Sequence, residues 1–369
     1  MIKGLYIHIP FCDQICSYCD FTKMVANKEI KEKYINALIQ ELRHYKEYYK
    51  DLKTIYIGGG TPSSLEINLL EKLLVEINNA IDVSLIEEFS IETNPNDINI
   101  NLLDLFYKYG VNRISVGVQT LSDKGCIVLS RNHKREDIIK AIEVIQESSI
   151  TNYNLDFIYG FPYQTIESLK KDIQFIEKYK PPHISYYSLI IEDNTILGYN
   201  ISKNIIKPLD DDLIADYAIY INGELKKQGY VHYEFSNFAR NNLYSKHNMI
   251  YWDLEEYIGI GLNASSFYNN RRYINPNRIT DYFNSVFNRK YYLEEEPCVL
   301  DVEFVLMGLR KLKGIDILEF KERFNINIFE RFPGLKKFLG SNLLVLEDNY
   351  LHFTEKGVLL SNQVYLEII

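Results

Sequence analysis

Three cysteines with the spacing of a metal or cluster site lie near the start of the chain, in the stretch "CDQICSYCDF". Cys12, Cys16 and Cys19 form the pattern C-x3-C-x2-C. Three clustered cysteines suit no pairwise disulfide scheme, and such clusters usually bind metal. Structural zinc takes four ligands, commonly from paired C-x2-C knuckles. An iron–sulfur cluster held by three thiolates leaves one iron open for a small molecule, and the sequence favours this interpretation.

Zinc remains the alternative because a fourth ligand could lie elsewhere in the chain. His8 is close in sequence, but its place in the alternating stretch "GLYIHIP" favours packing or hydrogen bonding within a strand. Cys126 and Cys298 are isolated, and an isolated cysteine is most often a small buried hydrophobe. A zinc-stabilised binding module is therefore kept as an alternative function.

The elements that would position the cysteines alternate between strands and helices. Short β-branched runs predict six strands, at 4–10, 54–60, 87–95, 113–120, 154–160 and 183–191. Apolar residues at helical spacing predict helices at 29–49, 64–80, 99–109, 135–148 and 165–179, followed by one at 210–228. This order predicts an α/β fold, a partial (β/α)6 barrel with helices on its outer face. A complete eight-stranded barrel would need two more units, and the alternation fades after residue 191.

The chain divides into three predicted parts, the barrel over 1–230, a connecting region over 231–296 and a C-terminal domain over 297–369. The connecting region is irregular, polar and aromatic in its sequence. The C-terminal part predicts helices at 300–312 and 316–323, then the strand–turn–strand "LLVLEDNYLHFT" and a last helix. This order indicates a small helical, winged-helix-like domain. We expect it to cover the open bottom or side of the barrel, because an open sheet edge needs a cover.

Polar side chains and glycines fall where the predicted strands end. The segment "GGGTP" closes the second strand, Glu92 and Gln119 end the third and fourth, and Asp156 lies in the fifth. In a parallel barrel these carboxyl ends form the active face. Glycines let the backbone approach a ligand, and a carboxylate accepts hydrogen bonds from a ribose diol or an ammonium group. Glu92 as a surface carboxylate and Arg131 as a solvated loop residue are the alternatives.

Six segments between residues 6 and 165 resemble the coproporphyrinogen III oxidase-like branch of the radical SAM superfamily, and the resemblance extends over nearly the whole chain. They are "YIHIPFC", "IYIGGGTPSSL", "SIETNP", "GVNRISVGVQT", "SRNHK" and "LDFIYGFPYQT". The resemblance implies that Cys12, Cys16 and Cys19 hold a [4Fe–4S] cluster. It also implies that the open iron binds the amino and carboxylate groups of S-adenosylmethionine (SAM), whose reductive cleavage gives a radical in that family.

The resemblance also implies which residues contact SAM. By matching motifs, Tyr6 lies against the methionine moiety, and the other expected contacts are Gly59, Gly60, Thr61, Glu92, Gln119, Arg131 and Asp156. The oxidase of this branch can hold a second SAM molecule. Tyr18 and Ile190 match positions near that second site.

Three features favour the haem chaperones of this branch over its oxygen-independent coproporphyrinogen III oxidase, which is the alternative function. Phe21 stands where the oxidase has a further cysteine, and the chain begins five residues before Tyr6, without the long extension of the oxidase. The segment "HNMIYW" matches a haem-associated HN-x-x-YW motif, so His247 is the candidate haem ligand. A neutral imidazole is a sound axial ligand for haem iron. The alternative is that His247 and Trp252 only anchor the join between the barrel and the C-terminal part.

Composition limits the partners. The net charge is −9, and no basic wing is present, so we expect no nucleic-acid binding. No apolar run reaches the length of a membrane span, and the N-terminus lacks a signal-peptide pattern, which predicts a cytoplasmic protein. The expected partners are haem and an acceptor protein. Peripheral association with membrane-bound acceptors, and a monomer or a cluster-dependent dimer, stay open.

Overall fold

One large sheet forms the body of the molecule, which the computed structural model describes over residues 1–291 and 293–369. Its strand order is β12-β11-β10-β9-β1-β2-β3-β4-β5-β6-β8-β7. The strands are β1 (Gly4–Ile9), β2 (Thr54–Gly59), β3 (Glu88–Thr93), β4 (Arg113–Gln119), β5 (Asn152–Tyr159), β6 (His183–Ser188), β7 (Val231–Glu234), β8 (Asn237–Ala239), β9 (Tyr257–Ile260), β10 (Ser265–Tyr268), β11 (Arg271–Ile274) and β12 (Glu294–Glu296). Strands β1 to β6 run parallel, as the sequence predicts.

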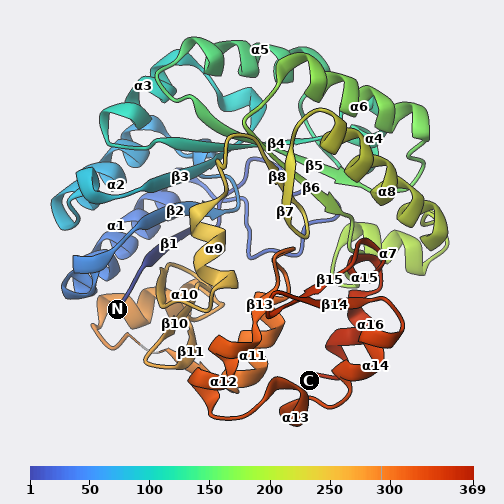
Figure 1. The fold of residues 1–369 in the computed structure, drawn as a ribbon. Helices are drawn as coiled ribbons and strands as arrows, with labels where there is room; N and C mark the ends of the chain where they lie inside the picture. The colour runs from blue at the N-terminus through green and yellow to red at the C-terminus, as the bar shows by residue number, and fades with distance from the viewer. Residues whose placement is uncertain (292) are drawn as a thin grey trace.

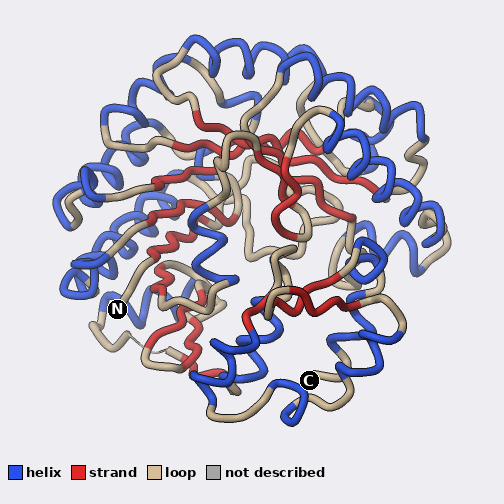
Figure 2. The backbone as a smooth tube through the Cα atoms, in the orientation of Figure 1, coloured by secondary structure: helices blue, strands red, loops and turns tan. Residues whose placement is uncertain are grey.

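Helices cover the outer side of the curved sheet (Figures 1 and 2). They are α1 (Lys28–His44), α2 (Ile67–Ala80), α3 (Ile100–Lys108), α4 (Asp123–Val128), α5 (Arg135–Glu147), α6 (Ile166–Tyr179), α7 (Ile196–Ser202), α8 (Asp211–Lys227) and α10 (Ile279–Phe287). A further helix, α9 (Lys246–Trp252), does not belong to this outer layer. Polar side chains cap their first turns; Asn27, Asn99 and Thr165, for example, accept from the backbone of α1, α3 and α6. The predicted helix 29–49 ends at His44, and a 3-10 turn over Lys46–Asp51 follows.

Strand alternation separates the two faces of the sheet. In β2, Ile55 and Ile57 are fully buried. Thr54 and Tyr56 point to the opposite face, where both contact His247 of α9. Figure 1 shows α9 on the concave side of the sheet, away from the covering helices. The concave face therefore carries polar side chains, while the convex face packs on helices.

The α/β partial barrel is confirmed, and the structure adds a seventh parallel strand to it. Strand β9 pairs parallel with β1, with Gly4 opposite Tyr257. The connecting region is therefore not irregular, since it supplies strands to both edges of the sheet as well as α9 and α10. Its strands have only three or four residues each, too short for a clear alternation signal.

The C-terminal part is a separate small sheet with helices, as predicted. Its strands are β13 (Ile315–Asp316), β14 (Leu344–Glu347) and β15 (Tyr350–Phe353), in the order β13-β15-β14. Its helices are α11 (Leu300–Gly308), α12 (Ile317–Phe324), α13 (Ile328–Arg331), α14 (Leu335–Gly340), α15 (Glu355–Leu359) and α16 (Ser361–Tyr365). The predicted last helix is thus two short ones. This domain lies across the open side of the curved sheet (Figure 1), where the backbones of Glu234 and Lys311 form an isolated antiparallel β-bridge.

None of the helices within the described ranges is long and apolar enough to cross a membrane.

Glu41 joins α1 to the connecting region and gives a prediction about stability. Its buried carboxylate accepts hydrogen bonds from Gly261 N, Asn275 Nδ2 and Tyr282 OH. Burial raises the pKa of Glu41 from 4.5 to about 7, against the opposing effect of these bonds. Since the folded state holds a proton that the unfolded state releases, this stabilisation is complete below about pH 4.5 and is lost as the pH rises to about 7.

We expect the free energy of unfolding to fall by about 3 kcal/mol over this window because of Glu41. The measurement is urea unfolding of the protein and of Glu41→Gln between about pH 5 and pH 8. The substituted chain should lack this part of the decline. If the free energy of unfolding of the protein and that of Glu41→Gln changed with pH in the same way, Glu41 would be ionised in the folded state throughout this range.

Candidate functional site

A cavity of about 500 Å³ opens at the carboxyl ends of the parallel strands. Most residues predicted to bind the cluster or SAM line it, namely Cys12, Cys16, Tyr18, Cys19, Gly59, Gly60, Thr61, Glu92, Gln119, Arg131, Asp156 and Ile190. Phe21 and Ile190 are 67% and 70% exposed at this cavity. The structure therefore brings together residues that are far apart in the sequence, at the active face that the parallel topology predicts.

The cysteine loop is fastened to the glycine-rich end of β2. Backbone bonds join Gly60 N to Ile9 O (2.8 Å) and Thr61 N to Phe11 O (2.7 Å). The Thr61 hydroxyl lies 3.6 Å from the Cys12 sulfur, to which it donates. The two segments thus form one rigid edge of the cavity.

Two of the glycines are required by close approach. A Cβ on Gly60 would lie 2.7 Å from Phe11 O and 3.0 Å from the Cys12 sulfur. Gly59 has φ +117°, and a Cβ there would lie 2.5 Å from the His8 ring. Any side chain at these positions would displace the cysteine loop or the ring, so the segment is built for bare backbone beside the cysteines.

Arg131 contacts the cysteine loop and is not a solvated loop residue. Its Nη1 donates to the Cys16 sulfur at 3.1 Å. Its Nη2 donates to Asn94 Oδ1 (2.7 Å) and to Gly117 O (2.8 Å). Arg131 thus ties the Cys16 side chain to Asn94 and to the backbone of β4.

Two carboxyl groups face the same cavity. Tyr56 OH donates to Glu92 Oε1 at 2.7 Å and Gly59 N to Glu92 Oε2 at 3.0 Å. Asp156 accepts from the Ser115 hydroxyl at 2.8 Å. Burial raises the pKa of Glu92 to about 7, opposed by the Tyr56 bond, and burial raises the pKa of Asp156 as well. The pair therefore suits a cationic ligand, whose charge would favour the ionised carboxylates.

The donor set fits a cluster better than a single ion. Burial raises the pKa of Cys12 to about 11, and burial also raises the pKa of Cys19, so these thiols need the charge of bound metal to ionise. Among residues 1–291 and 293–369, no three His, Cys, Asp or Glu side chains are arranged to hold one metal ion. A four-iron cluster attaches its cysteines to separate irons, so the sulfurs do not need to converge on one point.

Strain marks Gln119 at the end of β4. Its φ is +66°, in the left-handed region that only a few per cent of non-glycine residues adopt, and the pairing of β4 with β5 shifts register there. Such strain clusters at functional positions. Here it turns Gln119 toward the cavity.

Tyr56, Asn94 and Ser115 also line this site, although none of them is among the predicted SAM contacts. Each makes a hydrogen bond to a predicted residue, to Glu92, Arg131 and Asp156 respectively. The available signal was period-two alternation, which places polar Thr54 and Tyr56 on the face opposite Ile55 and Ile57.

Comparisons with known proteins cover the whole chain. A model of the radical SAM superfamily matches residues 6–176, and one of the HemN C-terminal domain matches residues 302–360. The "Heme chaperone HemW" of Lactococcus lactis is 36% identical over 375 residues, covering 98% of this chain and 96% of the relative. That of Bacillus subtilis is 33% identical over 372 residues, covering 99% and 98%. The chain belongs to the HemW family of the radical SAM superfamily.

The fold of this HemW family member also matches a solved structure of the Escherichia coli coproporphyrinogen III oxidase HemN. The TM-score is 0.84 over 100% of this chain and 90% of that chain, at 22% identity. At this identity the match shows the fold alone. Membership of the radical SAM superfamily implies a [4Fe–4S] cluster and SAM.

Two of the predicted ligand-binding residues do not line the cavity of about 500 Å³. Tyr6 lines a neighbouring cavity of about 440 Å³, beside Tyr251 and Tyr257. His247 is 1% exposed and lines neither cavity. Hydrogen bonds join its Nδ1 to Thr54 Oγ1 (2.6 Å) and its Nε2 to Tyr251 OH (2.7 Å). In this conformation, both ring nitrogens are therefore occupied by protein partners.

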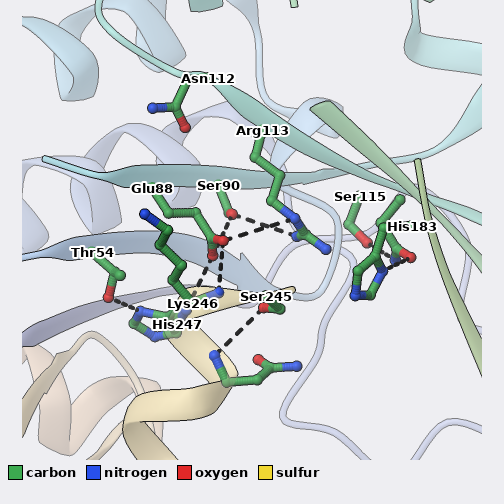
Figure 3. A network of polar contacts seen from close by, with 12 residues as sticks. Thr54, Glu88, Ser90, Asn112, Arg113, Ser115, His183, Ser245, Lys246 and His247 are labelled. Atoms are coloured by element: carbon green, nitrogen blue, oxygen red, sulfur yellow. Dashed lines mark hydrogen bonds and ion pairs between the residues drawn. The ribbon is translucent and has the colours of Figure 1, made fainter. Parts of the chain in front are cut away.

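A buried polar network holds the helix that carries His247 (Figure 3). The Glu88 carboxylate of β3 accepts from Lys246 N (2.8 Å) and His247 N (3.2 Å), at the start of α9. Arg113 of β4 lies 4.0 Å from the same carboxylate, and both side chains are almost fully buried. The barrel interior thus anchors α9 through a charged pair.

Proposed function

We propose that this protein is a haem chaperone that holds a [4Fe–4S] cluster, SAM and haem, and that it transfers haem to an acceptor protein. The observation that carries the proposal is the single cavity lined by three cysteines, two carboxyl groups and Arg131, in a chain similar to curated haem chaperones over nearly all its length. Cytoplasmic location and an unidentified acceptor belong to the same proposal.

In this proposal, Cys12, Cys16 and Cys19 hold the cluster, and Arg131 positions Cys16 through a hydrogen bond to its sulfur. The bound cluster would supply an open iron for SAM and a route for an electron. Bare backbone at Gly59 and Gly60 gives SAM room beside the cysteines. Glu92 and Asp156 balance the positive charge of SAM. Thr61 and Gln119, together with Tyr6 in the adjoining cavity, complete the predicted contacts. Tyr18 and Ile190 border the same cavity and remain the candidates for a second SAM.

Our proposal assigns haem binding to His247. Burial, with Arg113 nearby, lowers the pKa of His247 to about 3, so its ring is neutral, which is the form that ligates iron. Ligation through Nε2 requires Tyr251 to leave, since its hydroxyl occupies that nitrogen. Tyr251 borders two cavities, of about 430 and 440 Å³. Its displacement would open His247 toward either of them.

The test is anaerobic reconstitution followed by three assays on one sample. Iron and acid-labile sulfide should both be present, haem should give a Soret band, and incubation with coproporphyrinogen III, SAM and reductant should give no protoporphyrinogen. One zinc per chain without iron would instead support the binding module. Formation of protoporphyrinogen would support the oxidase.

The haem site gives a prediction with a matched control. His247→Gln should lose the Soret shift on haem addition, with an apparent affinity at least about tenfold lower. His183→Gln is the control, because His183 is as buried as His247. Both of its ring nitrogens are likewise bonded to protein side chains, those of Asn154 and Tyr233. Equal haem titrations for the two variants would remove His247 from the site.

The raised pKa of Glu92 gives a prediction for SAM binding. Below about pH 7 this carboxyl group is protonated and loses its attraction for a cation. We expect the SAM dissociation constant to fall about tenfold between about pH 6 and pH 8. Equilibrium dialysis with labelled SAM measures it. Glu92→Gln should bind more weakly and without this pH dependence; the same slope in that variant would assign the titration to another group.

A further inference from the structure

Tyr56 touches both proposed ligand sites at once. Its hydroxyl donates to Glu92 Oε1 at 2.7 Å, on the side of the SAM cavity. Its ring stacks on the His247 imidazole, with ring centroids 5.2 Å apart and planes 25° apart. The ring of Tyr6, which is also expected beside SAM, stacks on the Tyr56 ring, with ring centroids 6.3 Å apart. The Tyr56 side chain is therefore contacted by Glu92 and Tyr6 from the side of the SAM site, and it also contacts His247.

Neighbouring residues on β2 fix this arrangement. Thr54, two positions before Tyr56 on the same face, bonds to His247 Nδ1. Gly58, two positions after it, leaves the space that the Tyr56–Glu92 pair needs. A Cβ on Gly58 would lie 2.7 Å from the Tyr56 ring and 2.8 Å from Glu92 Oε1. Strand β2 thus contacts His247 through Thr54 and Tyr56. The absence of a side chain at Gly58 leaves room for the Glu92 carboxyl group.

We propose, on the basis of the function proposed above, that Tyr56 is a positioning residue that transmits occupancy of the SAM site to His247. A bound cation favours the ionised form of Glu92. An ionised acceptor strengthens the bond from the Tyr56 hydroxyl, and the tethered ring then holds His247 in its buried position. SAM therefore opposes haem ligation at His247, and haem opposes SAM to the same extent, since the coupling is reciprocal.

The first test observes His247 directly in the cluster-reconstituted protein. Histidine labelled with ¹⁵N gives ring signals, and His247→Gln identifies those of His247. SAM should shift the His247 signals in the unsubstituted protein but not in Tyr56→Phe, which keeps the ring and loses only the hydroxyl. Tyr282→Phe is the matched control, because its hydroxyl also bonds to a buried glutamate, Glu41, at 2.7 Å. This control should show the full shift.

The second test is a haem titration with and without saturating SAM. We expect SAM to weaken haem binding by at least about fivefold in the unsubstituted protein and in Tyr282→Phe, and by less than about twofold in Tyr56→Phe. Unmoved His247 signals in protein that binds SAM, or an unchanged effect of SAM in Tyr56→Phe, would overturn the relay alone. Equilibrium dialysis separates this from failure of the proposed function, in which SAM does not bind at all.

Discussion

Replacement of Cys16 by serine is expected to prevent cluster assembly. Cys16 is one of the three proposed thiolate ligands, and its sulfur is the one that Arg131 contacts, at 3.1 Å. Removal of a hydrogen-bonded partner around a metal site commonly costs about 10- to 100-fold in affinity, and loss of a ligand itself exceeds this. Iron and acid-labile sulfide per chain should fall at least about tenfold after anaerobic reconstitution.

Cys126→Ser provides the control for thiol loss without ligand loss. Cys126 is buried on α4, where its thiol donates to Thr120 O rather than facing the cavity. This variant should keep its full iron and sulfide content. Full incorporation of iron and sulfide in Cys16→Ser would mean that Cys16 is not a required ligand and that another group takes its place.

Replacement of Glu88 by alanine is expected to lower the free energy of unfolding by about 3–5 kcal/mol. Glu88 and Arg113 are each 2% exposed. Truncation leaves the buried guanidinium without its nearest carboxylate and removes the acceptor of the Lys246 and His247 amide groups. The loss therefore combines an uncompensated buried charge with two unsatisfied donors. Urea unfolding measures it.

The adjacent residue supplies the comparison. Glu87 makes ion pairs with Lys53 and Lys246, but its side chain is 44% exposed. Exposed pairs contribute little because water and salt screen them, so Glu87→Ala should cost less than about 1 kcal/mol. If Glu88→Ala were as stable as Glu87→Ala, the buried pair would not be what holds α9 in place.

Sequence patterns predicted the first six strands and their helices to within a few residues, because each unit pairs a β-branched run with a long amphipathic helix. The same patterns failed for β9. Its sequence "YIGI" is four residues long and lies among aromatic and polar residues, and its pairing with β1 is a long-range contact that no local pattern encodes.

For the candidate site as well, the sequence predicted one part and missed another. Motif spacing identified the cysteines, and Glu92, Gln119 and Asp156 reach the cavity because parallel strands end at one face. Sequence alone did not show that His247 is buried or that Tyr56 lies between it and Glu92. Both facts depend on α9 entering the concave side of the sheet, which is a matter of tertiary packing.

The double pairing of β1 has a consequence for how the protein is made. Gly4 lies opposite Thr54 on one side and Tyr257 on the other. At about 5–20 residues per second, the ribosome delivers the second neighbour roughly 10 to 40 s after the first. Throughout that interval β1 presents an open edge beside the three cysteines, which is a surface for pairing with other chains. The nascent chain is therefore most vulnerable to aggregation before β9 emerges.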